Sequence, residues 1–298
     1  MPPPPQNPAP QQGEKRGIKV SVDLVVLHAS VVDERGNFIP DLKPANFRVF
    51  EDKVEQKLDV FSREDVPVTM GLVVDNSGSM REKRSQVNAA ALTFVKTSNP
   101  QDEAFVVNFN DEYYLDTEHD FTSDQQELNE ALSRIDSRGS TALYDAIVGS
   151  LGHLKKGHKD KRVLLVITDG EDDASRMTFE QTVKAAQQSN AAIYSIGVYS
   201  EEDRKHDRKN VRRAQKELKT LSDATGGEAY FPETLADVQA ICEKVARDIR
   251  NQYTLGYYPT NTARDGSFRA VSVQAIGRGK LSVRTRTGYY AQKASQGQ

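Results

Sequence analysis

The sequence has a single cysteine, no tryptophan and no apolar run long enough to cross a bilayer. The one cysteine, Cys242, excludes an internal disulfide and any Cys-x-x-Cys metal or redox site. It keeps helical step with Val238, Val245 and Ile249, which predicts a small core residue. Positive charge is not in excess: the formal net charge is -3 over 298 residues, so nothing favours nucleic acid or an anionic membrane as a partner. This length has room for one large domain and a smaller one.

The two ends of the chain differ from the rest. Residues 1–16 are proline-rich and predict a linker without the apolar segment of a signal peptide, and 292–298 predict a short tail. A Met directly before such a linker is also what a chain with its export signal removed would show. The start therefore fits an extracytoplasmic protein, secreted or in the cell envelope, and it also fits a cytoplasmic one.

Residues 66–250 alternate between strand and helix patterns. Nearly continuous apolar runs predict buried strands at 68–74, 104–109, 163–168 and 193–198, and 112–116 predicts a short edge strand. Strands without polar alternation are covered on both faces, as in parallel sheets. Between them, apolar residues recur at the helical period in sets that begin at Val87, Leu128, Leu143, Phe179, Val211 and Leu235. The pattern predicts an α/β fold, a doubly wound and mostly parallel sheet with helices on both faces, similar to a Rossmann fold.

Strand patterns alone occupy the flanking segments, 17–65 and 251–291. In the first, Ile18, Val20, Val22, Leu24 and Val26 alternate with mostly polar neighbours, and a hairpin with Val54, Leu58 and Val60 on its return strand is expected around 51–53. In the second, strands are expected at 253–258, 268–275 and 281–286. Each segment is too small for a core of its own. We therefore expect the two to pair in one small all-β, sandwich-like module, with the α/β region inserted between them.

A polar loop follows the first buried strand of the α/β region. The apolar run 70–74 ends at Asp75, and Ser77 and Ser79 follow at alternate positions around Gly78. In an extended segment three such oxygens can turn toward one point, and a carboxylate with two hydroxyls is an oxygen-only set of the kind that Mg²⁺, Mn²⁺ or Ca²⁺ prefers. The alternative is an Asp or Ser cap on the following helix, and the triplet alone does not separate the two.

Two further loops offer partners for such a site. Thr141 precedes the helix that contains Leu143 and Ile147, where its other possible role is an N-cap. Asp169, followed by Gly170, stands at the carboxyl end of the most apolar strand, where its other possible role is in a turn. Ligands in open α/β sheets bind outside the carboxyl ends of the strands, so three such loops together point to a binding site.

Asp75-x-Ser77-x-Ser79, followed by Thr141 and Asp169 in this order and strand context, resembles the metal-ion-dependent adhesion site (MIDAS) of von Willebrand factor type A (VWFA) domains. All five positions of the motif are present, and the resemblance covers roughly residues 66–250. The flanking segments, with 46–52, 253–259 and 286–290, are similar to a bacterial group of VWFA-related domain proteins, which is a less specific likeness.

The resemblance implies a protein-binding or cell-adhesion module without enzymatic activity, located outside the cytoplasm. Asp75, Ser77, Ser79, Thr141 and Asp169 would hold the metal, with Mg²⁺ as the first choice and Mn²⁺ or Ca²⁺ as alternatives. The partner would be a protein that presents an Asp or Glu carboxylate, with no nucleic acid and no membrane span involved. The resemblance also implies that the last α/β helix moves when a ligand occupies the metal. The sequence indicates no oligomeric state.

Two other functions stay open at this point. A metal-dependent hydrolase would have to borrow Glu171, Asp172 or Asp173, which we otherwise expect to form an acidic rim. A structural VWFA scaffold in a secreted or cell-envelope assembly would leave the metal site unused. The basic run 204–209 could bind an anion, but charge runs at the start of a helix are usually solvated, and we interpret it in that way.

Overall fold

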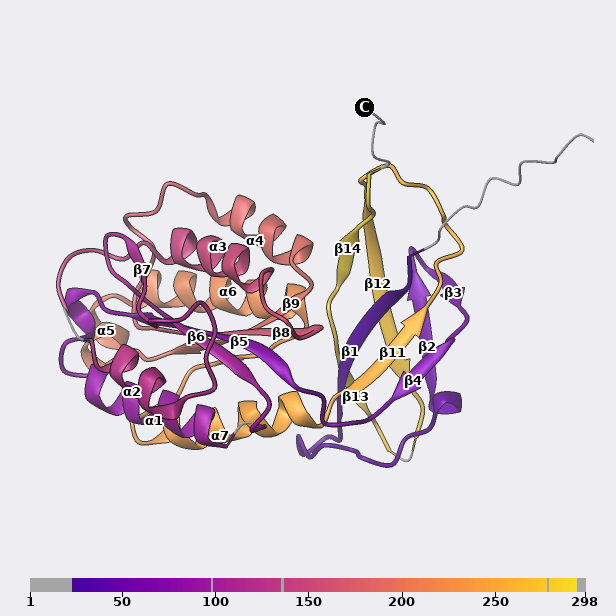
Figure 1. Cartoon of the computed structure of the whole chain (residues 1–298), viewed down its shortest axis with the longest axis horizontal. Coiled ribbons are helices and arrows are strands. Elements are labelled where there is room, and N and C mark those ends of the chain that lie inside the picture. Colours follow the sequence, from indigo (N-terminus) through magenta and orange to yellow (C-terminus); the bar gives the residue numbers. More distant parts are fainter. Residues whose placement is uncertain (1–22, 98, 135–136, 278, 294–298) are drawn as a thin grey trace, which may run out of the picture.

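A computed structural model describes residues 23–97, 99–134, 137–277 and 279–293, and the statements below concern these residues. Two units lie side by side, an α/β unit and an all-β unit (Figure 1). The all-β unit holds both the first described segment, in indigo, and the last, in yellow, and the sequence between them forms the α/β unit (Figure 1). The expected linker at 1–16 and the first apolar positions of 17–65, Ile18, Val20 and Val22, lie outside the described residues. In the described ranges no helix is long and apolar enough to span a membrane.

A six-stranded sheet in the order β10-β9-β8-β5-β6-β7 forms the centre of the α/β unit. Its strands are β5 (Val68–Asp75), β6 (Glu103–Phe109), β7 (Tyr113–Leu115), β8 (Lys161–Thr168), β9 (Ala191–Gly197) and β10 (Ala229–Tyr230). All neighbours are parallel except β7, which runs antiparallel to β6. Every residue of β5 is buried, which explains its unbroken apolar run. The chain adds strands to both sides of β5, so the carboxyl end of β5 is the switch point where a doubly wound sheet leaves a crevice.

Helices cover both faces of this sheet (Figure 1). One layer consists of α1 (Arg84–Lys96), α2 (Gln125–Ser133) and α7 (Asp237–Arg250), which share a core with Met70, Leu72 and Val74. The other consists of α3 (Leu143–Leu154), α4 (Phe179–Gln188) and α6 (Arg208–Thr225), which pack with Val73 on the opposite face of β5. The short α5 (Glu201–His206) follows β9, and a 3₁₀ turn (Gly78–Met80) precedes α1. Cys242 is fully buried in α7, as predicted.

Two antiparallel sheets make up the all-β unit. One has the order β13-β1-β11-β4 and the other β14-β12-β2-β3. The early strands are β1 (Val25–Val32), β2 (Phe47–Glu51), β3 (Val54–Gln56) and β4 (Val60–Ser62), with a 3₁₀ turn at Pro44–Asn46; the late ones are β11 (Tyr253–Tyr257), β12 (Phe268–Ala275), β13 (Ser282–Arg284) and β14 (Gly288–Tyr290). Early and late strands pair within each sheet, β1 and β4 with β11 and β2 with β12, around one shared core. The predicted fold class is therefore confirmed, whereas the residue-level domain boundaries stay a prediction.

The sequence pattern of the first strand predicted the wrong face of β1 as the buried one. In β1 the alternate residues Val25, Leu27, Ala29 and Val31 are buried. Val26 is 38% exposed, and Leu24, just before the strand, is 37% exposed. Both sets are apolar because the second face also has a neighbour: Leu24 and Val26 line a cleft of about 710 Å³ between the two units. Period-2 patterning cannot choose a face when both faces have apolar surroundings.

Other differences concern short strands. Val60 was expected on the return strand of the hairpin at 51–53, but that strand ends at Gln56 and Val60 begins β4 in the other sheet. The two-residue β10 and the three-residue β14 were not predicted. Such elements are too short to show a period, and their pairing partners lie far away in the sequence.

Candidate metal centre

Asp75 stands at the carboxyl end of β5 and is fully buried. One carboxylate oxygen, Oδ1, accepts the backbone N–H of Ser77 at 2.8 Å, and the other, Oδ2, accepts the hydroxyl of Thr168 from β8 at 2.6 Å. These two bonds fix the side chain against the turn that follows β5 and against the neighbouring strand. Burial and the negative charge of Asp169 raise the pKa of Asp75 to about 6, so removal from water and a second carboxylate together disfavour its charged form.

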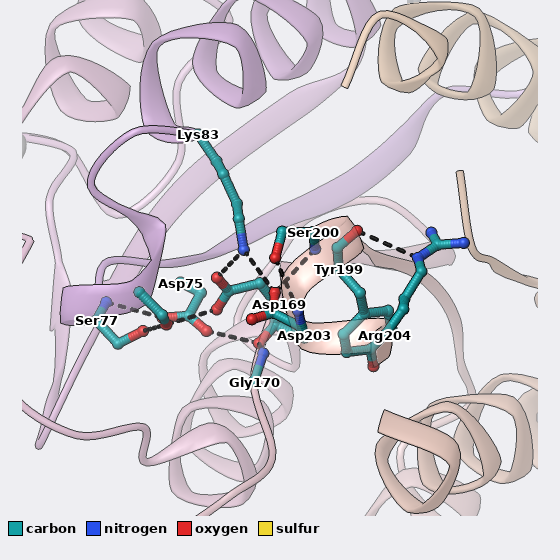
Figure 2. A network of polar contacts seen from close by, with 11 residues as sticks. Asp75, Ser77, Lys83, Asp169, Gly170, Tyr199, Ser200, Asp203 and Arg204 are labelled. Carbon is teal, nitrogen blue, oxygen red and sulfur yellow. Dashed lines mark hydrogen bonds and ion pairs between the residues drawn. The ribbon is translucent and has the colours of Figure 1, made fainter. Parts of the chain in front are cut away.

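A chain of oxygen atoms connects the first loop to the third. The hydroxyls of Ser77 and Ser79 lie 3.1 Å apart, and the Ser79 hydroxyl donates to Asp169 Oδ1 at 2.8 Å. Asp169 directly follows β8, which is parallel to β5 and ends at the same edge of the sheet. Figure 2 shows Asp75, Ser77 and Asp169 pointing toward one another from these two loops.

Thr141 joins the cluster from the loop before α3. Its backbone N–H donates to Asp173 Oδ1 at 2.7 Å, which ties the start of α3 to the loop after β8. A Cβ atom placed on Gly170 would lie 3.3 Å from the Thr141 hydroxyl oxygen, so the Thr141 side chain lies close to the residue that follows Asp169. The loop before α3 also meets the loop after β5, because Gly78 N donates to the carbonyl of Gly139 at 3.3 Å. The three predicted loops thus meet at one edge of the sheet, with the Thr141 hydroxyl beside Gly170, and a common ligand role for the five residues stays a prediction.

The acidic stretch after Asp169 has a structural role that differs from the expected rim. Asp172 accepts the backbone N–H of Tyr144 at 3.1 Å, and Asp173 accepts that of Thr141, so both carboxylates hold the amino-terminal turn of α3. Glu171 pairs with Arg213 of α6 at 2.7 Å. Across the described ranges no three His, Cys, Asp or Glu side chains group in a way that could hold a metal ion. A metal at this edge would therefore depend on hydroxyl as well as carboxylate oxygens.

Sequence reasoning missed two side chains that contact the cluster, Thr168 and Lys83, and a third, Asp203, that contacts Lys83. Thr168 supports Asp75, as described above. Lys83 places its ammonium against Asp169 Oδ2 and lies 3.4 Å from Asp203 of α5 (Figure 2). A threonine at the end of a buried strand is unusual enough to have been found, whereas a lysine before a helix and an aspartate beside a basic run carry no such signal.

Comparison with known proteins agrees with this geometry. Residues 70–171 match the family model described as von Willebrand factor type A domain, and this stretch contains all five residues of the cluster. The doubly wound sheet, the site at its carboxyl edge and this match together identify the α/β unit as a VWFA domain. An uncharacterised protein of Borreliella burgdorferi is 35% identical over 85 residues, which is 28% of this chain and 25% of that protein. The match thus spans about a quarter of that relative's length.

Solved structures show the same fold at low identity. A von Willebrand factor type A protein from Catenulispora acidiphila gives a TM-score of 0.52 at 13% identity and covers 84% of this chain and 74% of its own. The vWF domain of a type V pili tip protein from Porphyromonas gingivalis gives 0.51 at 14% identity, with 62% of this chain and 95% of its own covered. Proximal thread matrix protein 1 from the mussel byssus, solved with a zinc-occupied MIDAS motif, gives 0.51 at 15% identity and covers 67% and 49%.

Proposed function

We propose that the α/β unit is a metal-dependent protein-binding module whose dication is held by Asp75, Ser77, Ser79, Thr141 and Asp169. One observation carries the proposal: the Ser77, Ser79 and Asp169 oxygens follow one another at 3.1 and 2.8 Å although they come from two loops at the edge of the sheet. Capping alone does not explain this contact. In the turn before α1, the side chain of Ser77 makes no cap hydrogen bond, so its hydroxyl is available for another role.

The donor set fits a hard dication. Two carboxylates and three hydroxyls provide only oxygen, which suits Mg²⁺ or Ca²⁺ better than a soft metal. A dication would also relieve the repulsion between Asp75 and Asp169, which contributes to the raised pKa of Asp75. The zinc-occupied MIDAS motif of the mussel protein supports a divalent ion at this place in the fold.

The exposed side of the cluster is where a partner can reach it. Ser77 is 2% exposed and Asp75 is fully buried, whereas Gly78 and Ser79 are exposed. When bound, the dication would supply an electrophilic centre for an incoming carboxylate. The three hydroxyl ligands add no negative charge of their own, so part of the positive charge remains for an Asp or Glu of the partner. The pili tip protein with this fold supports a role in protein contacts outside the cytoplasm.

Isothermal titration with Mg²⁺, Mn²⁺ and Ca²⁺ tests the metal site. The double variant Ser77→Ala, Ser79→Ala removes two hydroxyls without a large cavity, and we expect it to lose measurable binding. Ser133→Ala is the matched control, because this serine only donates to a helix carbonyl on the surface. If wild type takes up none of the three ions, or if the double variant binds as well as wild type, the proposal is wrong.

A second experiment tests the partner chemistry. The wild-type chain and the double serine variant are immobilised and exposed to surface extracts of the source cells, in Mg²⁺ and in chelator. A genuine partner is retained by wild type in Mg²⁺ only. Prior amidation of the extract's carboxyl groups with a carbodiimide and an amine is expected to abolish retention. Retention that survives both the chelator and the amidation would show a different mode of binding.

A further inference from the structure

Lys83 stands where a helix does not favour a lysine. It is the N-cap of α1, at the end of the helix where backbone N–H groups carry partial positive charge. Its side chain makes no capping bond, and the first turn of α1 contains no acidic residue to compensate. A cation at this end opposes the helix dipole, so the position needs support from elsewhere in the fold.

That support comes from two carboxylates on different loops. The ammonium pairs with Asp169 Oδ2 and lies 3.4 Å from Asp203 Oδ2. The Lys83 side chain is only 12% exposed and that of Asp169 only 1%, whereas that of Asp203 is 41% exposed. The pair with Asp169 is thus largely shielded from solvent, where an ion pair is stronger than on the surface. Figure 2 shows Lys83 reaching from the start of α1 to the space between the two aspartates.

Both carboxylate oxygens of Asp169 already have partners. Oδ1 accepts the Ser79 hydroxyl, and Oδ2 carries the ammonium of Lys83. A dication held by the cluster needs the same carboxylate, and it also repels an ammonium at short range. Metal and Lys83 therefore compete for Asp169.

We propose that Lys83 is a tethered cation that lowers the metal affinity of the cluster, and that Asp203 receives its ammonium when a dication binds. This inference rests on the proposed metal site and assigns two residues outside the MIDAS motif to its control. Asp203 is suited to the role, because its other contacts are to Ser200 within the same capping box and leave it in place at the first turn of α5. The ammonium needs only a small movement, since it already lies near both carboxylates.

The two residues predict opposite effects on metal binding. Lys83→Met keeps the length of the side chain and removes the competitor, so the affinity for Mg²⁺ and Mn²⁺ is expected to rise by about tenfold or more, the value of a charge-assisted hydrogen bond. Asp203→Asn removes the receiving charge, so displacing Lys83 becomes harder and the affinity falls several-fold. Lys96→Met, at the exposed far end of the same helix, controls for the loss of one positive charge and should change nothing.

Titration calorimetry on the full chain measures these affinities, with thermal melts to verify folding and Lys83→Gln as a second variant if Lys83→Met is unstable. Amide hydrogen exchange gives an independent reading: Mg²⁺ should increase protection of α5 in wild type and not in Lys83→Met. If wild type binds metal and Lys83→Met binds no more tightly, this inference is wrong while the metal site stands. If Asp203→Asn gains affinity, its receiving role is wrong. If neither wild type nor Lys83→Met binds any of the ions, both proposals fall together.

Discussion

Replacing Thr168 by valine removes the hydroxyl that supports Asp75 from β8 while nearly keeping the shape of the side chain. The hydroxyl donates to Asp75 Oδ2 at 2.6 Å and accepts the N–H of Gly170 at 3.1 Å, and Thr168 is fully buried. A hydrogen bond to a charged group contributes about 1.5–3 kcal/mol, and the unpaired N–H adds about 1 kcal/mol. We therefore expect Thr168→Val to lower the free energy of unfolding by about 2–4 kcal/mol.

Urea denaturation in the presence of chelator measures this loss without a metal contribution. Thr182→Val is the matched control: Thr182 is equally buried, but its hydroxyl donates to the neutral carbonyl of Thr178 at 3.0 Å, so about 1 kcal/mol is expected. Calorimetry should also show Mg²⁺ affinity reduced by about 10–100-fold, as for other groups that orient a metal ligand. The reasoning is refuted if both valine variants lose the same stability, because the charge of Asp75 would then contribute nothing.

Three further predictions concern other parts of the fold. Burial and two nearby positive charges lower the pKa of His28 from 6.5 to about 3, so folding favours its neutral form. The free energy of unfolding therefore falls as the pH drops below 6.5, by up to about 1.4 kcal/mol per pH unit. Urea melts at pH 7 and pH 5 should show that His28→Gln loses less stability between these two pH values than wild type does. Burial raises the pKa of the Cys242 thiol to about 12, so a thiol reagent should modify it only at the rate of unfolding. A Cβ on Gly71 would lie 2.4 Å from Leu164 and 2.5 Å from Phe105, so Gly71→Ala should cost about 1–3 kcal/mol in a thermal or urea melt, and an unchanged melt would contradict the close packing of β5.

The meeting of the loops after β5 and β8 could be predicted from the sequence, because it depends only on where two parallel strands end. Asp75 and Asp169 each end an apolar strand, and parallel neighbouring strands end at one edge, so their meeting follows from topology once the strands are recognised. Thr141 follows in the same way, as the start of a helix between these two strands. In each case a local sequence pattern identifies the end of a strand or the start of a helix, and the parallel sheet brings these positions to the same edge.

Lys83 and Asp203 could not be found in this way. Their contacts join residues 86 and 120 positions apart, and they depend on the reach of one long side chain rather than on a strand end. In sequence, a lysine before a helix reads as a solvated charge, and only its low exposure in the structure reveals otherwise. The prediction of the buried face of β1 was wrong for a different reason. Leu24 and Val26 line the cleft toward the neighbouring unit, so they are apolar although they do not belong to the core.

The pairing of β4 with β11 has a consequence for how the two units are connected. Ser62 and Thr254 are cross-strand partners, and the whole VWFA domain leaves and re-enters the all-β unit just beyond them. A short turn can therefore close the gap where the domain is cut out, and would convert β4 and β11 into an ordinary hairpin. The same two positions are where a different domain could be inserted into this all-β unit.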